Sequence, residues 1–160
     1  MNPDSELAKL MSHFPRNGRV EWIGVRPARR AALAELASVD ALQGRGLEGD
    51  RYSGGGKRQV TLIQAEHLDA VAQLLGVDAV EPARVRRNIV VSGINLYALR
   101  DRRFQVGGAL LEGSGTCDPC SRMEEVLGAG GYNAMRGHGG ITARIVEGGV
   151  ISVGGAVESI

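Results

Sequence analysis

One cysteine of this 160-residue chain stands where a reactive thiol is expected. In the run CDPCSRMEEVLG at 117–128, Asp118 is a good helix cap, Pro119 suits the first helical position, and a glycine ends the run. This pattern places Cys120 at the second helical position, among unpaired N–H groups at the positive end of the helix dipole. Such surroundings favour the thiolate, so Cys120 is a candidate nucleophile or soft-metal ligand. Cys117 precedes the helix, and we expect it to be a small buried apolar residue.

Other uses of this C-x-x-C pair fit the sequence less well. Two thiols do not complete a four-ligand zinc site, and the three histidines (His13, His67 and His138) lack the spacing that would supply the rest. A thioredoxin-like redox pair is typical of a βαβ setting, whereas the strand patterns here predict a mostly β chain.

Arginines and glycines gather at two further places. Of the 19 basic residues, 17 are arginine, whose planar fork suits carboxylates and phosphates. Three arginines (Arg84, Arg86 and Arg87) lie directly before Asn88. Six glycines fall between 128 and 140, around Arg136 and His138. Such a backbone can present several N–H groups to one phosphate. A mobile surface loop is an equally good interpretation of that second run.

Two nucleotide-binding motifs are present only in part. The G-x-G-x-x-G pattern at 44–49 is followed by DRYSGGG, which does not form the helix that receives a pyrophosphate. Near Lys57, the run GGGK lacks the first glycine and the Ser or Thr of a P-loop, and Arg51 and Arg58 stand there instead. These departures exclude NAD and ATP binding by either motif.

Composition limits the class of protein further. With 43% hydrophobic and 23% charged residues, the chain is an ordinary globular domain. Its net charge of +1 gives no overall field toward nucleic acid or a membrane, so we expect neither as a partner. The N-terminus lacks the pattern of a signal peptide, and two cysteines three residues apart do not suggest a secreted disulfide framework. We therefore expect a cytoplasmic protein with reduced thiols.

Short apolar strands separated by glycine pairs predict a β-barrel or sandwich with small helices attached. The expected helices lie at 4–13 and 64–75, besides the one that holds Cys120. The expected strands lie at 19–26, 36–42, 58–63, 88–92, 104–106, 109–112, 141–147, 150–153 and 156–160. The pairs at 107–108, 148–149 and 154–155 are expected at hairpin corners.

Six segments in order resemble the MOSC domain, the family named for the C-terminal domain of molybdenum cofactor sulfurases. They are GLEGDR at 46–51, RQVTLI at 58–63, RRNIVVSGI at 86–94, GGALLE at 107–112, CDPC at 117–120 and the strands of 141–157. The resemblance implies a mainly β fold, a MOSC-type β-barrel with a few short helices. We expect a single MOSC domain at 19–160, preceded by an N-terminal helical extension at 1–18.

The resemblance also implies binding of the molybdenum cofactor, in which a pterin (molybdopterin) carries a dithiolene and a phosphate tail. In the family a single cysteine carries sulfur or ligates molybdenum, and the P-C-x-[KR]-[LM] pattern gives that place to Cys120. Arg86 and Asn88 match an R-x-N segment that holds the cofactor in the amidoxime-reducing branch. Arg58 opens the R-Q-V-x-L-I strand, and we add it, with Arg136, as a candidate for binding phosphate or pterin.

Two positions depart from the family pattern. Tyr52 stands where many relatives have His, and Arg87 where many have Glu. Some relatives also carry a pyridoxal-phosphate cysteine desulfurase domain, which this sequence lacks, so we expect a separate cysteine desulfurase to be the sulfur donor. A molybdoenzyme or a redox partner would be the other participant.

The expected function is therefore that of a molybdenum-cofactor-binding protein. It would act as a sulfur carrier, as a sulfurtransferase or as a component of a molybdenum-dependent reductase, and the sequence leaves open which of these. The alternative is a non-enzymatic β-barrel module that binds another phosphorylated ligand, in which Cys120 is structural.

Overall fold

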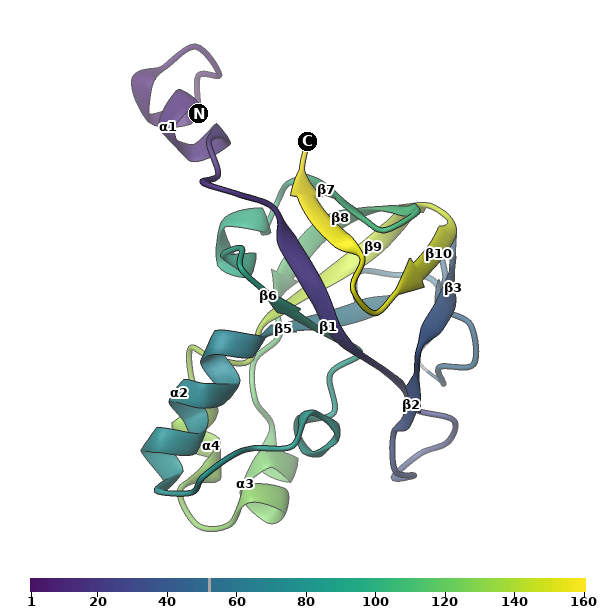
Figure 1. The fold of residues 1–160 in the computed structure, drawn as a ribbon, viewed down its shortest axis with the longest axis vertical. Helices are drawn as coiled ribbons and strands as arrows, with labels where there is room; N and C mark the ends of the chain where they lie inside the picture. The colour runs from purple at the N-terminus through teal and green to yellow at the C-terminus, as the bar shows by residue number, and fades with distance from the viewer. Residues whose placement is uncertain (52) are drawn as a thin grey trace.

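A closed β-barrel forms the body of the protein (Figure 1). The computed structural model describes residues 1–51 and 53–160, and the departure at Tyr52 lies outside the described residues. Within these ranges, seven strands close the barrel in the order β1-β11-β7-β8-β9-β5-β6, and β6 returns to β1. Their bounds are β1 Gly18–Val25, β5 Val60–Gln64, β6 Ile89–Ser92, β7 Arg103–Val106, β8 Ala109–Thr116, β9 Ile141–Glu147 and β11 Ala156–Ser159. The prediction of a mainly β barrel with a few short helices is confirmed.

Four further strands lie outside the closed barrel. β2 (Ala34–Leu36) pairs with the end of β1, while β10 (Gly149–Ser152), β3 (Ser38–Leu42) and β4 (Gly46–Leu47) form a small separate sheet among the described residues. The glycine pair at 107–108 turns the chain between β7 and β8. A Cβ at Gly149 would lie 2.0 Å from the carbonyl oxygen of Gly108, so the two corners pack too closely for side chains there.

Three helices gather at one end of the barrel in Figure 1: α2 (Ala65–Leu75), α3 (Ser121–Leu127) and α4 (Gly131–Met135). Their apolar sides share a small core in which Val71 of α2 packs with Met123 and Met135. At the opposite end, α1 (Glu6–Ser12) precedes β1 and carries Ser5 as its cap. None of the helices in the described ranges is long and apolar enough to span a bilayer.

Four sequence predictions need correction. The predicted strand at 36–42 is two strands that separate at Ala37, and β8 continues four residues beyond the predicted end at 112. The glycine-rich run 128–140 contains α4, which the glycines concealed. The helix after Pro119 begins at Ser121, so Cys120 is its cap residue rather than its second position.

The main chain of Cys117 explains that last difference. Its N–H donates to the carbonyl of Gly140 (2.9 Å), and its carbonyl accepts from the guanidinium of Arg87 (3.0 Å). The chain is therefore held against β9 at this point, and Cys120 keeps an extended backbone (φ −121°, ψ 177°). The predicted helix would need helical backbone at Cys120, so the extended backbone observed there makes Ser121 the first helical residue.

Candidate functional site

The candidate site lies at the end of the barrel where β1 finishes and β5 and β6 begin. β5 and β6 run parallel and pair Leu62 with Ile89, while β1 runs antiparallel to β6 and pairs Ile23 with Ile89. Residues that follow β1 and residues that precede β5 and β6 are therefore brought to the same end. The N-terminal end of α3 covers it, with Cys120 as the cap residue.

A cavity of about 110 Å³ opens between these elements. Cys120 is an exposed free thiol at its edge, and Met123 of α3 supplies an apolar contact. The remaining lining is arginine from four segments of the chain: Arg26, Arg58, Arg86, Arg87 and Arg122. Five guanidinium groups around one thiol have the chemistry to bind an anion, because guanidinium donors match the geometry of phosphate and carboxylate oxygens.

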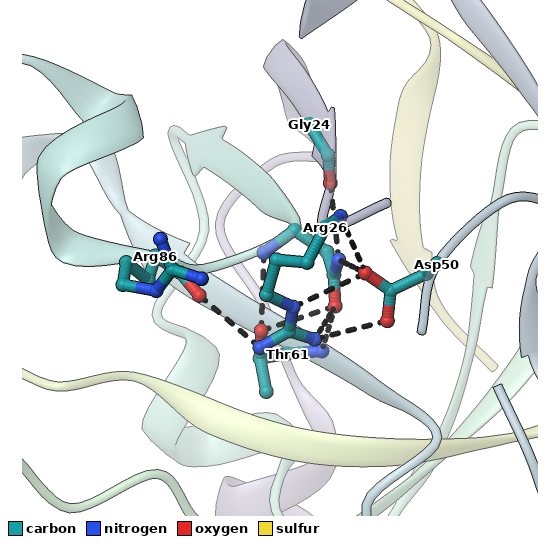
Figure 2. Close-up of polar contacts among 6 residues, drawn as sticks. Gly24, Arg26, Asp50, Thr61 and Arg86 are labelled. Carbon is teal, nitrogen blue, oxygen red and sulfur yellow. Dashed lines mark hydrogen bonds and ion pairs between the residues drawn. The ribbon is translucent and has the colours of Figure 1, made fainter. Parts of the chain in front are cut away.

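Arg26 forms a buried ion pair with a carboxylate at the back of the cavity. Its Nη2 lies 3.1 Å from Oδ2 of Asp50, and both side chains are buried (4% and 0% exposed). Oδ1 of Asp50 accepts from the Arg26 main-chain N–H (2.7 Å) and from Nε (3.1 Å). Figure 2 shows Arg26 between Asp50 and Arg86, whose main-chain carbonyl accepts from Arg26 Nη1 (3.3 Å). This network fixes Arg26 as the rigid back of the cavity.

Asn88 belongs to the same network rather than to the surface of the cavity. Its Oδ1 accepts from Arg26 Nη2 (3.0 Å) and from the main-chain N–H of Thr61 (3.1 Å). Its Nδ2 donates to the carbonyl of Gly24 (3.0 Å). The residue is fully buried, so in this structure its polar atoms are already engaged. Asn88 therefore ties β1, β5 and β6 together and positions Arg26.

Arg87 is a buried cation whose contacts are main-chain carbonyls. Only 4% of the residue is exposed, and its guanidinium donates to Val85 (2.7 Å), Gly139 (3.0 Å) and Cys117 (3.0 Å). Burial lowers the pKa of Arg87 from its ordinary value, and the nearby thiol of Cys117 acts in the opposite direction. Because arginine remains charged in proteins, the site holds a positive charge that carbonyl dipoles alone compensate in the described chain.

The other three lining arginines are Arg58, Arg122 and Arg86. Arg58 is exposed and lies close enough to Arg87 to lower the pKa of that guanidinium. Nε of Arg122 is buried and has no hydrogen-bond partner among the described residues, as expected of a donor that a ligand would satisfy. Arg86 has a left-handed backbone (φ 60°), and its Nη1 donates to the carbonyl of Ala31 (2.9 Å).

The structure therefore brings together three of the residues singled out in the sequence: Cys120, Arg58 and Arg86. It does not bring Arg136 to this cavity. Arg136 is the cap residue directly after α4 and is exposed, and its Nη1 lies 3.5 Å from Oδ1 of Asn133. The glycine-rich run consists of the short helix α4 and the segments on either side of it.

Three lining residues (Arg26, Arg87 and Arg122) were not selected from the sequence as binding residues. The available signals were position and context: Arg26 follows a strand directly, and Arg122 follows the candidate cysteine by two residues. Arg87 was noted as one of the three arginines before Asn88 and as a departure from the family pattern. No cluster of three or more His, Cys, Asp or Glu side chains that would hold a metal ion occurs in residues 1–51 and 53–160.

A second group of titratable residues lies behind the site. The rings of His67 on α2 and His138 after α4 meet edge to face, with centroids 5.1 Å apart. Burial, and then the neighbouring His138, lower the pKa of His67 from its ordinary value. The segment that follows His138 packs closely, since a Cβ at Gly140 would lie 1.9 Å from the carbonyl oxygen of Leu62. This segment contacts both Cys117 and Arg87, so it supports the main chain that leads to Cys120.

Comparison of folds finds several solved structures of the same architecture. The YUAD protein of Bacillus subtilis superposes with a TM-score of 0.80 at 20% identity, over 92% of this chain and 98% of that one. YiiM from Escherichia coli gives 0.71 at 19% identity, over 91% of this chain and 70% of that one. YiiM from Geobacillus stearothermophilus gives 0.71 at 16% identity, over 89% and 75%. At these identities the likeness shows a shared fold.

Sequence comparison gives the family. No curated protein matches the sequence. The family model of the MOSC domain matches residues 49–158, which is more than half of the chain. This range contains the strands that begin at the site, together with Cys120 and four of the five lining arginines. The chain belongs to the MOSC domain family.

Proposed function

We propose that the protein binds the molybdenum cofactor at the arginine-lined cavity and uses Cys120 as the reactive thiol of that site. The observation that carries the proposal is the buried cation of Arg87, which has carbonyl but no carboxylate partners in the described chain, beside an exposed free thiol. Removing a charge from water costs several kcal/mol unless a partner compensates, so an anionic ligand would stabilise this arrangement.

The residues present fit this cofactor. Guanidinium donors suit its phosphate, and a thiolate is a soft ligand that suits molybdenum. Nε of Arg122 adds a buried donor that has no partner in the described part of the chain and that an acceptor on the ligand would satisfy. Arg58, Arg86 and Arg122 would hold the anionic part, Arg26 and Arg87 would supply fixed positive charge behind it, and Asn88 would keep Arg26 in place. When bound, the cofactor supplies the redox chemistry of its metal, which the side chains of this chain do not provide.

Cys120 has two possible uses in this proposal. As a ligand it would bind through its sulfur without bond exchange. As a carrier it would attack the outer sulfur of a cysteine desulfurase persulfide: a new S–S bond forms on Cys120, the donor's S–S bond breaks, and the donor cysteine leaves as thiolate. The neighbouring guanidinium groups would stabilise the negative charge of the resulting persulfide. The proposal places the protein in the cytoplasm, where thiols stay reduced.

A second candidate function is supported by the size of the cavity. About 110 Å³ encloses one anionic group rather than a whole pterin, so a module that binds another phosphorylated ligand would use the same arginines. In that case Cys120 has no chemical role, although its exposure is unusual for a structural cysteine.

Copurification distinguishes the two. Wild type, Cys120→Ala and Cys117→Ala are expressed in a host that makes the cofactor, and molybdenum and pterin are measured per protein. We expect both in wild type and a loss of molybdenum in Cys120→Ala. Absence of molybdenum and pterin from wild type would overturn the cofactor proposal, and equal contents in wild type and Cys120→Ala would exclude Cys120 as a ligand. Persulfide labelling after incubation with a cysteine desulfurase then tests the carrier role, since only variants that retain Cys120 should be labelled.

A further inference from the structure

Positive charge continues beyond the cavity that holds Cys120. The segments 26–31, 51–58 and 84–87 contain three Lys or Arg residues each and no Asp or Glu. Hydrogen bonds join them: the N–H of Arg51 donates to the carbonyl of Arg26 (2.7 Å), and Nη1 of Arg26 donates to the carbonyl of Arg86 (3.3 Å). Nearly half of the 19 basic residues therefore gather at one end of the barrel, in a chain with a net charge of +1.

The segment 26–31, which is part of the connection between β1 and β2, forms the rim beside Arg86. The bond from Arg86 Nη1 to the carbonyl of Ala31 places the preceding residue, Arg30, next to an arginine that lines the cavity. Arg29 and Arg30 are both exposed. Within residues 1–51 and 53–160, their guanidinium groups form neither a hydrogen bond nor an ion pair. Two charges thus stand at the rim without a carboxylate partner.

The backbone of this rim is strained at the two arginines that meet there. Arg30 and Arg86 have φ values of 59° and 60°, in the left-handed region that glycine adopts most readily. Asp101 is the third non-glycine residue with positive φ in the described ranges. Strain of this kind gathers at ligand-binding and active sites. In this protein the strained backbone occurs at two arginines, although glycine would adopt the same conformation more readily.

We propose that the anion site is a double one that takes a ligand with two linked phosphates, of the pyrophosphate or nucleoside diphosphate class. One phosphate would occupy the cavity beside Cys120, and the second would contact Arg29 and Arg30. The cavity of about 110 Å³ is smaller than the roughly 300–1,000 Å³ of pockets that enclose a small ligand, so the rest of any ligand lies outside it. The unpaired guanidinium groups of the rim have the chemistry to hold a second phosphate. This inference rests on the proposed function, because the first phosphate uses the same cavity.

Titration calorimetry at constant ionic strength tests the second position separately from the first. The probes are inorganic phosphate, pyrophosphate and ADP, and the test variant is Arg29→Ala/Arg30→Gly. Glycine at position 30 keeps the left-handed backbone without strain, so this variant should fold at least as well as wild type. Arg19→Ala/Arg103→Ala removes the same charge from exposed arginines elsewhere on the barrel and is the control.

We expect the test variant to lose about tenfold or more in pyrophosphate affinity, which corresponds to the loss of one or two charge-assisted contacts, and to change little toward phosphate. If the test variant also binds ADP more weakly than wild type does, the ligand class is a diphosphate ester. If ADP does not bind to wild type, the ligand class is free pyrophosphate. Equal pyrophosphate binding by wild type and the test variant would overturn the double site while leaving the cavity intact. Failure of phosphate to bind wild type would instead count against the cavity as an anion site.

Discussion

The buried pair of Arg26 and Asp50 permits the sharpest quantitative prediction. The change is Asp50→Asn, which keeps the shape of the side chain and removes its charge. At present the two carboxylate oxygens accept four hydrogen bonds, three from Arg26 and one from Asn88. An amide at this position has one oxygen only, and its NH₂ group would face donors. The guanidinium of Arg26 would also lose the carboxylate that it contacts at present.

Breaking a buried pair by removal of one partner costs about 3–5 kcal/mol, because the remaining charge stays buried and uncompensated. For a domain of this size, 1 kcal/mol corresponds to about 2–4 °C in melting temperature, so Asp50→Asn should melt roughly 6–20 °C below wild type. Urea denaturation at neutral pH measures the free energy directly, with the slope as a check on two-state behaviour.

The matched control is Glu6→Gln, which removes the same charge from an exposed pair. The Nζ of Lys9 lies 3.4 Å from Oε1 of Glu6, and the two side chains are 57% and 89% exposed. Such pairs contribute about 0–1 kcal/mol. If Asp50→Asn lost no more stability than Glu6→Gln, the reasoning about the buried network would be refuted. The double variant Arg26→Met/Asp50→Leu should recover part of the loss, since it leaves neither charge unpaired.

Three other predictions concern the segments behind the site. Because the folded state lowers the pKa of His67 below 6.5, the unfolded chain binds the proton more readily. Wild type should therefore lose stability as the pH falls below 6.5, and a melting-temperature profile of His67→Gln should be flatter in that window. Gly140→Ala should lose at least about 2 kcal/mol in urea denaturation, since its Cβ would lie 1.9 Å from the carbonyl oxygen of Leu62 at φ 86°. Gly137→Ala has φ 80° but open space and should lose less; equal losses would contradict the packing argument. The carboxylate of Glu124 accepts from the N–H groups of Gly130 (3.1 Å) and Tyr132 (3.0 Å), so Glu124→Gln should speed amide exchange at both positions while α2 stays protected.

Regular elements were predictable where side-chain period and end signals agreed. The strand at 141–147 was predicted with its observed bounds because apolar residues alternate along it. The helix that ends at Leu75 was predicted from its apolar spacing and from Gly76, which has φ 72°. α4 was missed because its glycines argued against a helix, whereas the contacts that stabilise it come from other segments of the chain. Its support is the carboxylate of Glu124 and the packing of Met135 against α2 and α3.

The sequence predicted the kinds of side chain at the candidate site, a cysteine and arginines, better than it predicted which residues lie there. Cys120, Arg58 and Arg86 followed from local motifs and from the family resemblance. The position of Asn88 depends on Arg26, 62 residues earlier in the chain, which no local pattern reveals. Arg87 is a buried cation because its guanidinium donates to main-chain carbonyls, two of which lie 30 and 52 residues away in the sequence. Such partners are known only once the strands are in register.

The pairing that closes the barrel joins two strands that are far apart in the sequence. β1 pairs at Gly18 with Val157 of β11, so the barrel stays open until both strands have been made and have met. Until then, both of these strand edges offer unpaired N–H and C=O groups to other chains. The segments at 26, 58, 86 and 120 converge on the same closed scaffold. The cavity therefore depends on pairing between strands that are distant in the sequence, and a chain in which this pairing is incomplete is prone to aggregate.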